Sequence, residues 1–316
     1  MSPTVAVLSC GAALGVAAPV VLTRLPRLDR APQPAAWLWL TAAVGALSAL
    51  VFAGLLLIVG SSRLVVDLAV LLATCSMALR HALDAPTGAP GPLLGLLLLT
   101  VVLVGLLTGG AVAGTRAWRA ARDHRQLLAL AGRSQPGLPG VTVLDHPLPL
   151  AYCLRGRPGP VVLTTASLQR LDAGQLAAVL AHERAHQARR HHALLFAAEV
   201  LRIGFPWLPA ARAARAAVAR LVELAADDAA TRRHGPAEVA AAIAKLAAAP
   251  VPALGLSAAG ASTSERIHRL TTPAATGPQG ALLAASLVVV GPLLAELVAV
   301  GVPLLRVAGT PICPLT

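Results

Sequence analysis

Charged side chains are scarce in this chain of 316 residues. They make up only 13% of it, whereas they make up about a quarter of an average soluble protein. Hydrophobic residues make up 56% of the chain, and its mean hydropathy is +0.72. This composition excludes a disordered chain, because disordered chains are poor in apolar residues. It also argues against a wholly soluble enzyme, so we expect an integral membrane protein with an appreciable portion outside the bilayer.

Cysteine is also scarce, with residues at positions 10, 75, 153 and 313 and no CxxC spacing among them. This pattern predicts neither a disulfide framework nor a zinc site made of thiolates. We expect each cysteine to be a free and mostly buried thiol.

Long stretches without any charged residue occur at 1–23, 31–62, 85–115 and 271–295. Each is long enough for a helix that crosses a hydrocarbon core about 30 Å thick, which takes roughly 20 residues. The first stretch is not expected to be a cleavable signal peptide, because no basic residue precedes it and arginines follow it. We expect transmembrane helices near 3–23, 36–60, 91–114 and 280–305. The chain then divides into a membrane part (1–114), a domain outside the membrane (115–278), and a fourth span with a short tail (279–316).

The distribution of arginine predicts the orientation of these spans. The segments 24–35 and 116–133 are rich in arginine, whereas 61–90 and the C-terminal tail hold few. Because cytoplasmic segments carry the excess of basic residues, we expect domain 115–278 in the cytoplasm of a plasma-membrane protein, with both termini outside. The apolar run 64–79 would be a fifth span, but Asp67 interrupts it. We expect it to form an amphipathic helix on the membrane surface.

The formal net charge of +12 follows the same distribution, since residues 116–269 hold 20 basic and 10 acidic side chains. A basic balance can indicate a nucleic-acid partner. The positive-inside bias and attraction to anionic lipid headgroups explain it here without one. We therefore expect the lipid bilayer as a partner and no direct binding of nucleic acid.

Domain 115–278 is large enough to have its own core. Its first part, 116–130, is expected to continue the third helix out of the membrane, and a Gly/Pro-rich stretch at 132–140 then breaks the chain. Short runs at 141–144, 151–154 and 161–165 predict a small meander of strands. Helical spacing begins at Asp172, and further helices are expected at 193–208 and 211–231. The segment 264–270 is expected to lead back to the membrane.

The pattern His182-Glu-Arg-Ala-His186 is the main chemical signal. Residues four apart lie one turn apart on the same face of a helix, so both imidazoles can bind one Zn²⁺. Glu183 lies about 100° round that helix. It is near enough to reach a water in the open coordination position of a catalytic zinc, where it would act as general base.

A catalytic zinc site needs a third protein ligand. The candidate is Glu223, on a later predicted helix, and Asp227 lies on the same face one turn further. Asp227 could accept a hydrogen bond from a ligand histidine and so fix its tautomer. The alternative is an ordinary surface pattern, with Glu223 paired to an arginine such as Arg220.

These motifs resemble those of the BlaR/MecR-type antirepressor membrane metallopeptidases. The resemblance rests on 178–186, on 190–192, on the Glu223-Leu-Ala-Ala-Asp227 motif, on the upstream runs within 145–164, and on a zinc domain inserted between a third and a fourth span. It implies a mostly α integral membrane protein whose inserted domain is an α+β zincin-like (gluzincin) metallopeptidase. It also implies His182, His186 and Glu223 as ligands of one Zn²⁺, Glu183 as catalytic base and Asp227 as partner of a ligand histidine. The antibiotic sensors of that family carry a penicillin-binding domain after the fourth span, whereas only about ten residues follow Leu305 here, so we expect no direct sensing of β-lactams.

We therefore expect a membrane zinc endopeptidase that cleaves a protein or peptide. The resemblance implies that the substrate is a transcriptional repressor in a signalling pathway. A CAAX-protease or HtpX-like housekeeping peptidase is the enzymatic alternative, and a zinc-bearing scaffold without activity is the alternative of another class. Glu183 favours an enzyme, because a structural zinc site has no use for a base. The activating signal and the oligomeric state are left open.

Several other residues are weaker candidates. The run 161–165 could be an edge strand that pairs with an extended substrate, and Tyr152 could stabilise an oxyanion, although a core position is favoured for it. His191 and His192 are expected at a surface or membrane interface, and His268 in packing or at lipid headgroups. Glu296 lies within the fourth span, where a carboxylate is costly and is a candidate for a role in regulation.

Overall fold

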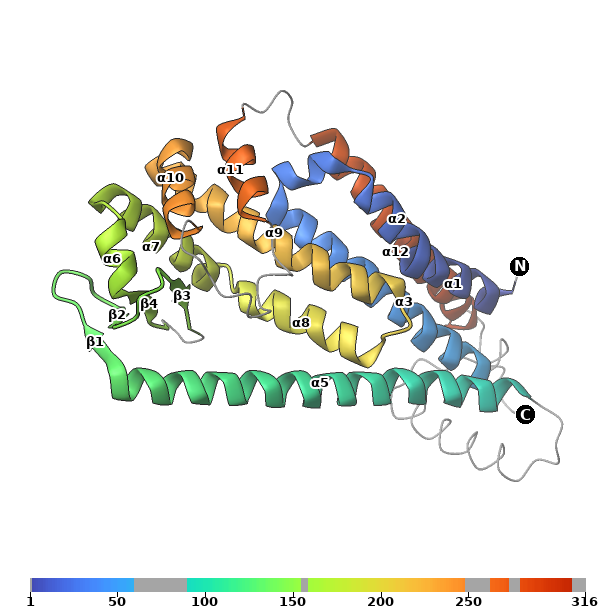
Figure 1. Cartoon of the computed structure of the whole chain (residues 1–316). Coiled ribbons are helices and arrows are strands. Elements are labelled where there is room, and N and C mark those ends of the chain that lie inside the picture. Colours follow the sequence, from blue (N-terminus) through green and yellow to red (C-terminus); the bar gives the residue numbers. More distant parts are fainter. Residues whose placement is uncertain (1, 60–89, 155–158, 248–261, 273–278, 309–316) are drawn as a thin grey trace, which may run out of the picture.

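The computed structural model describes residues 2–59, 90–154, 159–247, 262–272 and 279–308. The expected amphipathic helix at 64–79, together with Cys75 and Cys313, lies outside these residues. Most of the described chain is helical, and one small sheet lies at one end of the molecule (Figure 1). The prediction of a mostly helical chain with a small sheet is confirmed.

Within the described residues, four helical stretches are long and apolar enough to cross a membrane, as the sequence predicts. The first consists of α1 (Pro3–Ala12), the π-helical turn η1 (Ala13–Ala17) and α2 (Ala18–Thr23) in succession. A short 3-10 turn, η2 (Pro26–Arg30), leads to the second, α3 (Pro32–Val59). The third and fourth are α5 (Pro90–Ala131) and α12 (Gln279–Ala308).

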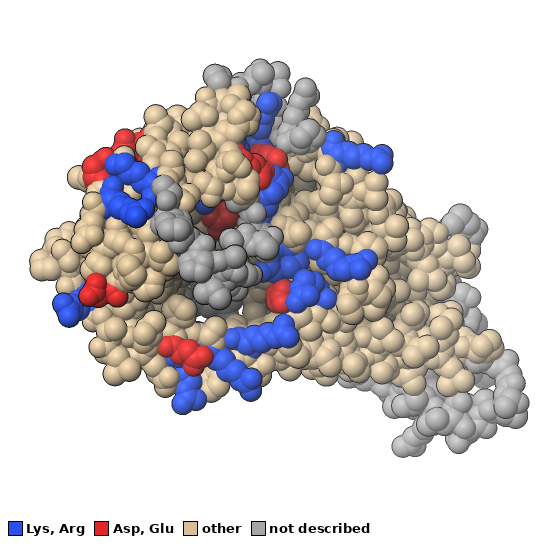
Figure 2. All heavy atoms as spheres, viewed as in Figure 1, with Lys and Arg blue, Asp and Glu red and all other residues tan. Residues whose placement is uncertain are grey.

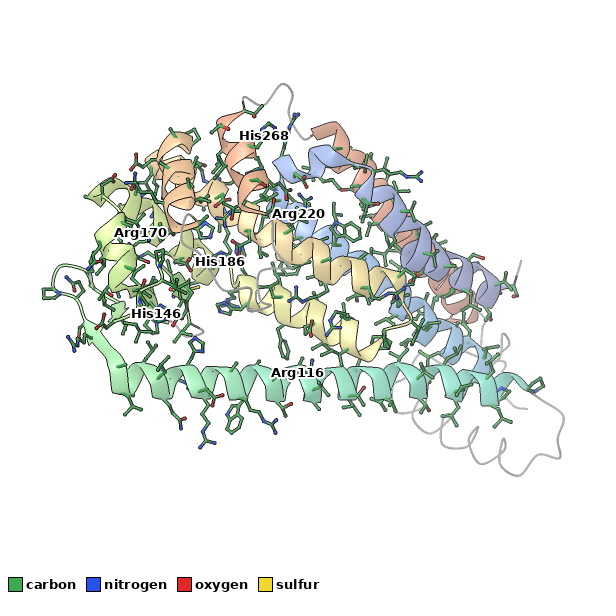
Figure 3. The ribbon with its side chains drawn as sticks, in the orientation of Figure 1. Arg116, His146, Arg170, His186, Arg220 and His268 are labelled. Carbon is green, nitrogen blue, oxygen red and sulfur yellow. The ribbon has the colours of Figure 1, made fainter. Side chains whose placement is uncertain are left out.

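Helix α5 runs without a break for 42 residues along the whole length of the molecule (Figure 1). Its second half carries the charged side chains, and Arg116 marks the change from the apolar half (Figure 3). The apolar half crosses α8 (His191–Gly204) very closely, since a Cβ atom on Gly204 would collide with the Gly105 carbonyl oxygen. Glycine at both positions therefore lets the two backbones touch, as in closely packed membrane helices.

The sheet has the order β1-β2-β4-β3, made of β1 (Gly132–Ser134), β2 (Val141–Leu144), β4 (Val161–Thr164) and β3 (Ala151–Cys153). Strands β2 and β4 are parallel, and the outer pairs are antiparallel. The prediction of a meander is therefore wrong, and β1 occupies part of the expected Gly/Pro break. All four residues of β4 are buried, which is typical of a strand covered on both faces and paired on both sides. The prediction that 161–165 is an edge strand is also wrong, because β3 holds that place.

The other regular elements described in the domain are helices. Beside α8 these are α6 (Thr165–Arg170), α7 (Ala173–Ala188), α9 (Pro209–His234), α10 (Pro236–Ala247) and α11 (Thr263–Thr271). The sequence predicts α7, α8 and α9, whereas α6, α10 and α11 are not expected from it. A capping box fixes the start of α7, because the Asp172 side chain accepts a hydrogen bond from the Gln175 backbone and the Gln175 side chain accepts one from the Asp172 N–H.

The largest apolar core joins the membrane-type helices to the domain. Trp39 of α3, Phe205 at the end of α8 and Leu221 of α9 are all buried in it. A second, smaller core lies between the sheet and α7, with Leu163 and Val179 among its members. The domain thus has a core of its own near the sheet, but α8 and α9 pack directly on α3. Charged side chains gather over the end with the sheet, and the surface over α1, α3 and α12 has almost none (Figure 2).

Candidate metal centre

Two histidines of α7 bring their Nε2 atoms together. His182 and His186 are one turn apart, and the two nitrogens lie 3.1 Å from each other. The capping box at Asp172 sets where α7 begins and therefore which face carries these side chains. That face is turned toward α9.

Glu223 of α9 completes a triad. Its Oε2 lies 3.6 Å from His182 Nε2, and its Oε1 lies 3.6 Å from His186 Nε2. Ligands about 2.1 Å from a tetrahedral zinc ion are about 3.4 Å from one another. The three donor atoms therefore have the spacing, and as two imidazoles and a carboxylate the chemistry, that a catalytic Zn²⁺ site needs. The structure brings together the three residues that the sequence proposed as ligands.

Asp227 lies beneath this triad and is fully buried. Its Oδ1 accepts a hydrogen bond from His182 Nδ1 at 3.0 Å, which leaves the lone pair of a neutral His182 on Nε2, facing the triad. Burial lowers the pKa of His182, but the hydrogen bonds and charges of Asp227 and Glu223 outweigh it and raise that pKa to about 9. Burial opposes ionisation of Glu223, yet His182, His186 and Arg266 together lower its pKa to about 2.

Arg266 of α11 was not anticipated from the sequence. Its Nε lies 2.8 Å from Asp227 Oδ2, its Nη2 lies 2.6 Å from Oδ1, and its Nη1 lies 3.4 Å from Glu223 Oε2. The signal that could have found it is indirect. A buried carboxylate such as Asp227 needs a cationic partner, and α11 is a short polar helix just before the fourth span.

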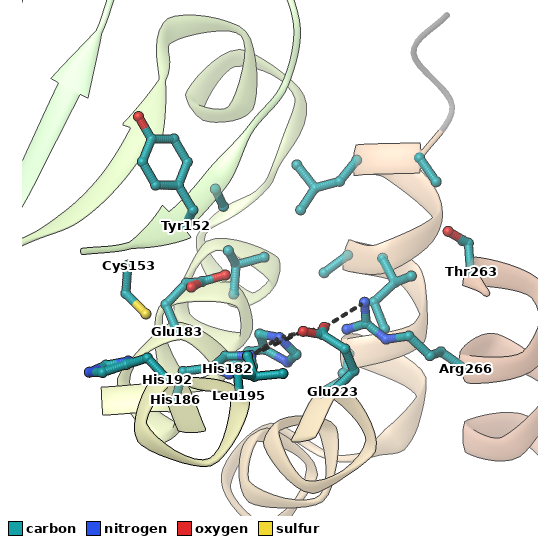
Figure 4. A pocket seen from close by; sticks show the side chains of 17 residues that line it. Tyr152, Cys153, His182, Glu183, His186, His192, Leu195, Glu223, Thr263 and Arg266 are labelled. Carbon is teal, nitrogen blue, oxygen red and sulfur yellow. Dashed lines mark hydrogen bonds and ion pairs between the residues drawn. The ribbon is translucent and has the colours of Figure 1, made fainter. Parts of the chain in front are cut away.

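Glu183 lies beside the triad and is buried. Burial raises the pKa of its carboxyl above the ordinary value, although the charge of His182 acts in the opposite direction. Its neighbour on β3 is Cys153, and burial followed by the Glu183 charge raises the pKa of that thiol to about 12. Glu183 and Cys153 face the same cavity (Figure 4).

The cavity in front of the triad has a volume of about 500 Å³. Its floor consists of His182, Glu183, His186 and Glu223, and β3 forms one side. The opposite side is mainly apolar and comes from α10, with Val239, Ala242, Ile243 and Leu246.

The remaining candidates lie in different places. His192 and Tyr152 line the cavity, but the Tyr152 ring points away from Glu183 and stacks edge-on against His124. His268 is exposed and lies near Thr272, with Oγ1 and Nδ1 3.4 Å apart. Glu296 is buried and accepts a hydrogen bond from Ser48 of α3.

The prediction that His191 lies at a surface or membrane interface is wrong. Its side chain is fully buried, and its Nδ1 lies 3.0 Å from His186 Nδ1. Arg190 adopts a left-handed conformation, with φ 52°, at the start of α8. This turn directs the side chain of His191 toward α7. Burial, followed by the charge of His186, lowers the pKa of His191 to about 3, so its ring is neutral at physiological pH.

Comparison with known protein families identifies the domain that carries the triad. Residues 116–274, half of the chain, match Peptidase family M48. This match covers the sheet and every residue of the triad. It does not single out the BlaR/MecR-type subfamily that the motifs suggested, and no solved structure matches the chain. The chain belongs to Peptidase family M48 and is a metallopeptidase by family.

Proposed function

We propose that this chain is a membrane-bound zinc endopeptidase. His182, His186 and Glu223 would bind one Zn²⁺, and Glu183 would be the catalytic base. The observation that carries the proposal is the spacing of the triad, 3.1 to 3.6 Å between donor atoms, next to a buried carboxylate that does not belong to it. A structural zinc site would be closed by four protein ligands, whereas three ligands and an adjacent base are typical of a hydrolytic site.

The side chains of the proposed site would have separate roles in peptide hydrolysis. When bound, Zn²⁺ would polarise the scissile carbonyl and make a nearby water more acidic. Glu183 accepts the proton of the attacking water and passes it to the leaving nitrogen. Burial supports this role, because a carboxyl with a raised pKa holds the proton long enough to donate it again. Asp227 keeps the hydrogen of His182 on Nδ1 throughout.

The substrate would lie along β3. Tyr152 pairs with Val162 of β4, and Leu150 and Leu154 also bond across to that side. The alternation of an antiparallel pair therefore leaves the backbone groups of Ala151 and Cys153 pointing away from β4. An extended peptide can pair with such an edge, and the apolar wall of α10 would accept one of its apolar side chains.

The resemblance in motifs supports a narrower proposal. The substrate is a protein, and by that resemblance a transcriptional repressor in a signalling pathway. The four apolar helices support a plasma-membrane location, and the arginine distribution supports a cytoplasmic active site with both termini outside. Housekeeping cleavage of membrane proteins, as in HtpX-like peptidases, is the competing substrate class.

Comparison of cells that express wild type with cells that express Glu183→Gln tests this function. Quantitative profiling of new protein N-termini should reveal termini that wild type produces and the variant does not. Glu238→Gln, the same chemical change on α10 outside the triad, is the matched control and should behave as wild type. If stressed cells give identical termini for wild type and Glu183→Gln, while the protein binds zinc, the chain is a zinc-bearing scaffold and the proposal is wrong.

A further inference from the structure

A hydrogen-bond chain links the candidate metal centre to the beginning of helix α3. His191 Nε2 lies 2.9 Å from the Gln33 side-chain oxygen, and His191 Nδ1 lies 3.0 Å from His186 Nδ1. The first of these contacts joins residues 158 positions apart in the sequence. Gln33 lies in the first turn of α3, a helix apolar enough to span the membrane.

The direction of these hydrogen bonds follows from which ring nitrogens carry a hydrogen. The Gln33 oxygen can only accept, so His191 Nε2 donates to it. A neutral His191 has one N–H, so its Nδ1 is an acceptor and His186 Nδ1 must donate. The remaining lone pair of a neutral His186 is then on Nε2, the atom that faces His182 and Glu223.

We propose that Gln33 is a positioning residue for the metal centre. Through His191, its oxygen holds the hydrogen of His186 on Nδ1 and leaves Nε2 free to bind Zn²⁺. Asp227 does the same for His182 from within the peptidase domain, whereas the partner of His186 comes from a membrane-type helix. The proposal rests on the proposed zinc site, and it makes zinc affinity depend on how α3 packs against α8.

The surroundings of both residues support this role. Gln33 is flanked by Pro32 and Pro34, and proline fixes its own φ near −65°, so the backbone that carries the amide is held in place. His191 is fully buried at the start of α8, directly after the left-handed turn at Arg190. The rings of His186 and His191 meet edge to face, with centroids 4.8 Å apart. The His191 ring is therefore not free to turn toward solvent.

Three substitutions of Gln33 distinguish the effect of hydrogen-bond direction on zinc affinity from the effect of packing. Gln33→Glu places a carboxylate acceptor where the amide oxygen lies, so it keeps the direction of the chain. Gln33→Lys offers only donors and reverses it, which moves the His186 hydrogen to Nε2. Gln33→Met has a similar size and no strong hydrogen bond. Zn²⁺ dissociation constants of the full-length protein in detergent, measured by competition with a chelator, should therefore increase from Gln33→Glu through Gln33→Met to Gln33→Lys.

The expected size of the effect follows from other metal sites, where loss of such an outer partner weakens binding about 10- to 100-fold. We expect Gln33→Glu to bind Zn²⁺ at least as tightly as wild type and Gln33→Met to bind it about tenfold more weakly. Gln187→Met is the matched control, because Gln187 lies on α7 beside His186 but donates to the Gly159 carbonyl at 2.8 Å. It should bind as wild type does.

Equal affinity of the three Gln33 variants would overturn the inference, as would tighter binding by Gln33→Lys than by Gln33→Glu. If Gln33→Met does not fold, the two charged variants decide, and equal affinity of Gln33→Glu and Gln33→Lys would overturn the inference. Failure of wild type to bind Zn²⁺ at all would instead overturn the proposed function together with this inference.

Discussion

Arg266 holds the buried carboxylate of Asp227 at two points, with Nε 2.8 Å from Oδ2 and Nη2 2.6 Å from Oδ1. Arg266 belongs to α11 and Asp227 to α9. This ion pair therefore connects the helix that precedes the fourth span to the carboxylate beneath the metal centre. Because Asp227 has no exposed surface, the carboxylate depends on its partners for its charge. Burial acts against that charge, but the hydrogen bonds from Arg266 and His182 lower the pKa of Asp227.

Arg266→Met should therefore be strongly destabilising. Removal of one partner from a buried ion pair costs about 3–5 kcal/mol in the free energy of unfolding, because the other charge stays buried and unpaired. Chemical denaturation of the purified protein measures this loss. Arg202→Met is the control, since Arg202 pairs with Glu199 near the surface, where such pairs contribute at most about 1 kcal/mol. Equal losses in the two variants would contradict the argument.

Zinc binding should strengthen as the pH rises. The pKa of His182 is about 9, whereas burial, followed by opposing effects of Glu223 and His182, brings the pKa of His186 to about 4. Near neutral pH only His182 holds a proton that zinc must displace, so binding releases about one proton. The apparent affinity should increase about tenfold per pH unit between about pH 6 and pH 8.

Chelator competition at several pH values measures this slope. Asp227→Asn removes the charge that raises the pKa of His182, so the slope should be shallower in that variant. A wild-type affinity that stays constant over that pH range would show that His182 is already neutral and would contradict the prediction.

The sequence was sufficient to propose each pair of residues because helical spacing is local information. His182 and His186 share one helix, and Glu223 and Asp227 share another, so helical spacing alone brings each pair to one face. Arg266 and His191 could not be found in this way. Their positions depend on how α11 and α8 pack on other helices, and the buried place of His191 depends on one left-handed residue, Arg190.

The sheet shows the same limit. The apolar runs of β2, β3 and β4 were recognisable, but the order of pairing is a tertiary property. β4 enters between β2 and β3, parallel to β2. If the strands paired in chain order, β4 would be the edge strand available to a substrate. In the structure β3 is at that edge instead.

Ala151→Pro should reduce substrate binding without unfolding the sheet. The Ala151 N–H points away from β4, and proline is tolerated on an edge strand where its missing N–H would face outward. We expect KM for a peptide substrate to rise while the thermal unfolding midpoint stays near that of wild type. Val162→Pro is the contrasting variant, because β4 is paired on both sides and proline there should unfold the sheet. Unchanged KM in folded Ala151→Pro would show that the substrate does not pair with β3.

Cys153 should react slowly although it lines the cavity. Its thiol has a pKa of about 12, and the thiolate is the reactive form, whose fraction falls tenfold per pKa unit. A variant in which Cys10, Cys75 and Cys313 are replaced by serine isolates this thiol. Its alkylation by iodoacetamide at about pH 8 should be about a thousandfold slower in the folded protein than in denaturant. Rates within about tenfold of each other would show that burial and Glu183 do not suppress the thiolate.

Glu296→Gln should leave the metal centre intact. Glu296 Oε2 accepts a hydrogen bond from Ser48 at 2.9 Å, and this contact joins α12 to α3. Its Oε1 has no hydrogen-bond partner among the described residues, so only one oxygen of the side chain acts as an acceptor there. Glutamine supplies that acceptor without a charge that is costly inside an apolar helix bundle.

We therefore expect Glu296→Gln to keep the zinc content of wild type and to change how proteolysis responds to stress in cells rather than the cleavage itself. Metal analysis of the purified variant, together with cleavage measured before and after stress, tests this. Glu296→Leu is the matched comparison, because it removes the acceptor as well as the charge. Since α3 carries both Ser48 and Gln33, loosening α12 from α3 in Glu296→Leu should also weaken the Gln33–His191 contact and lower zinc affinity. Loss of zinc in Glu296→Gln as well would show that the charge itself supports the metal centre, contrary to this argument.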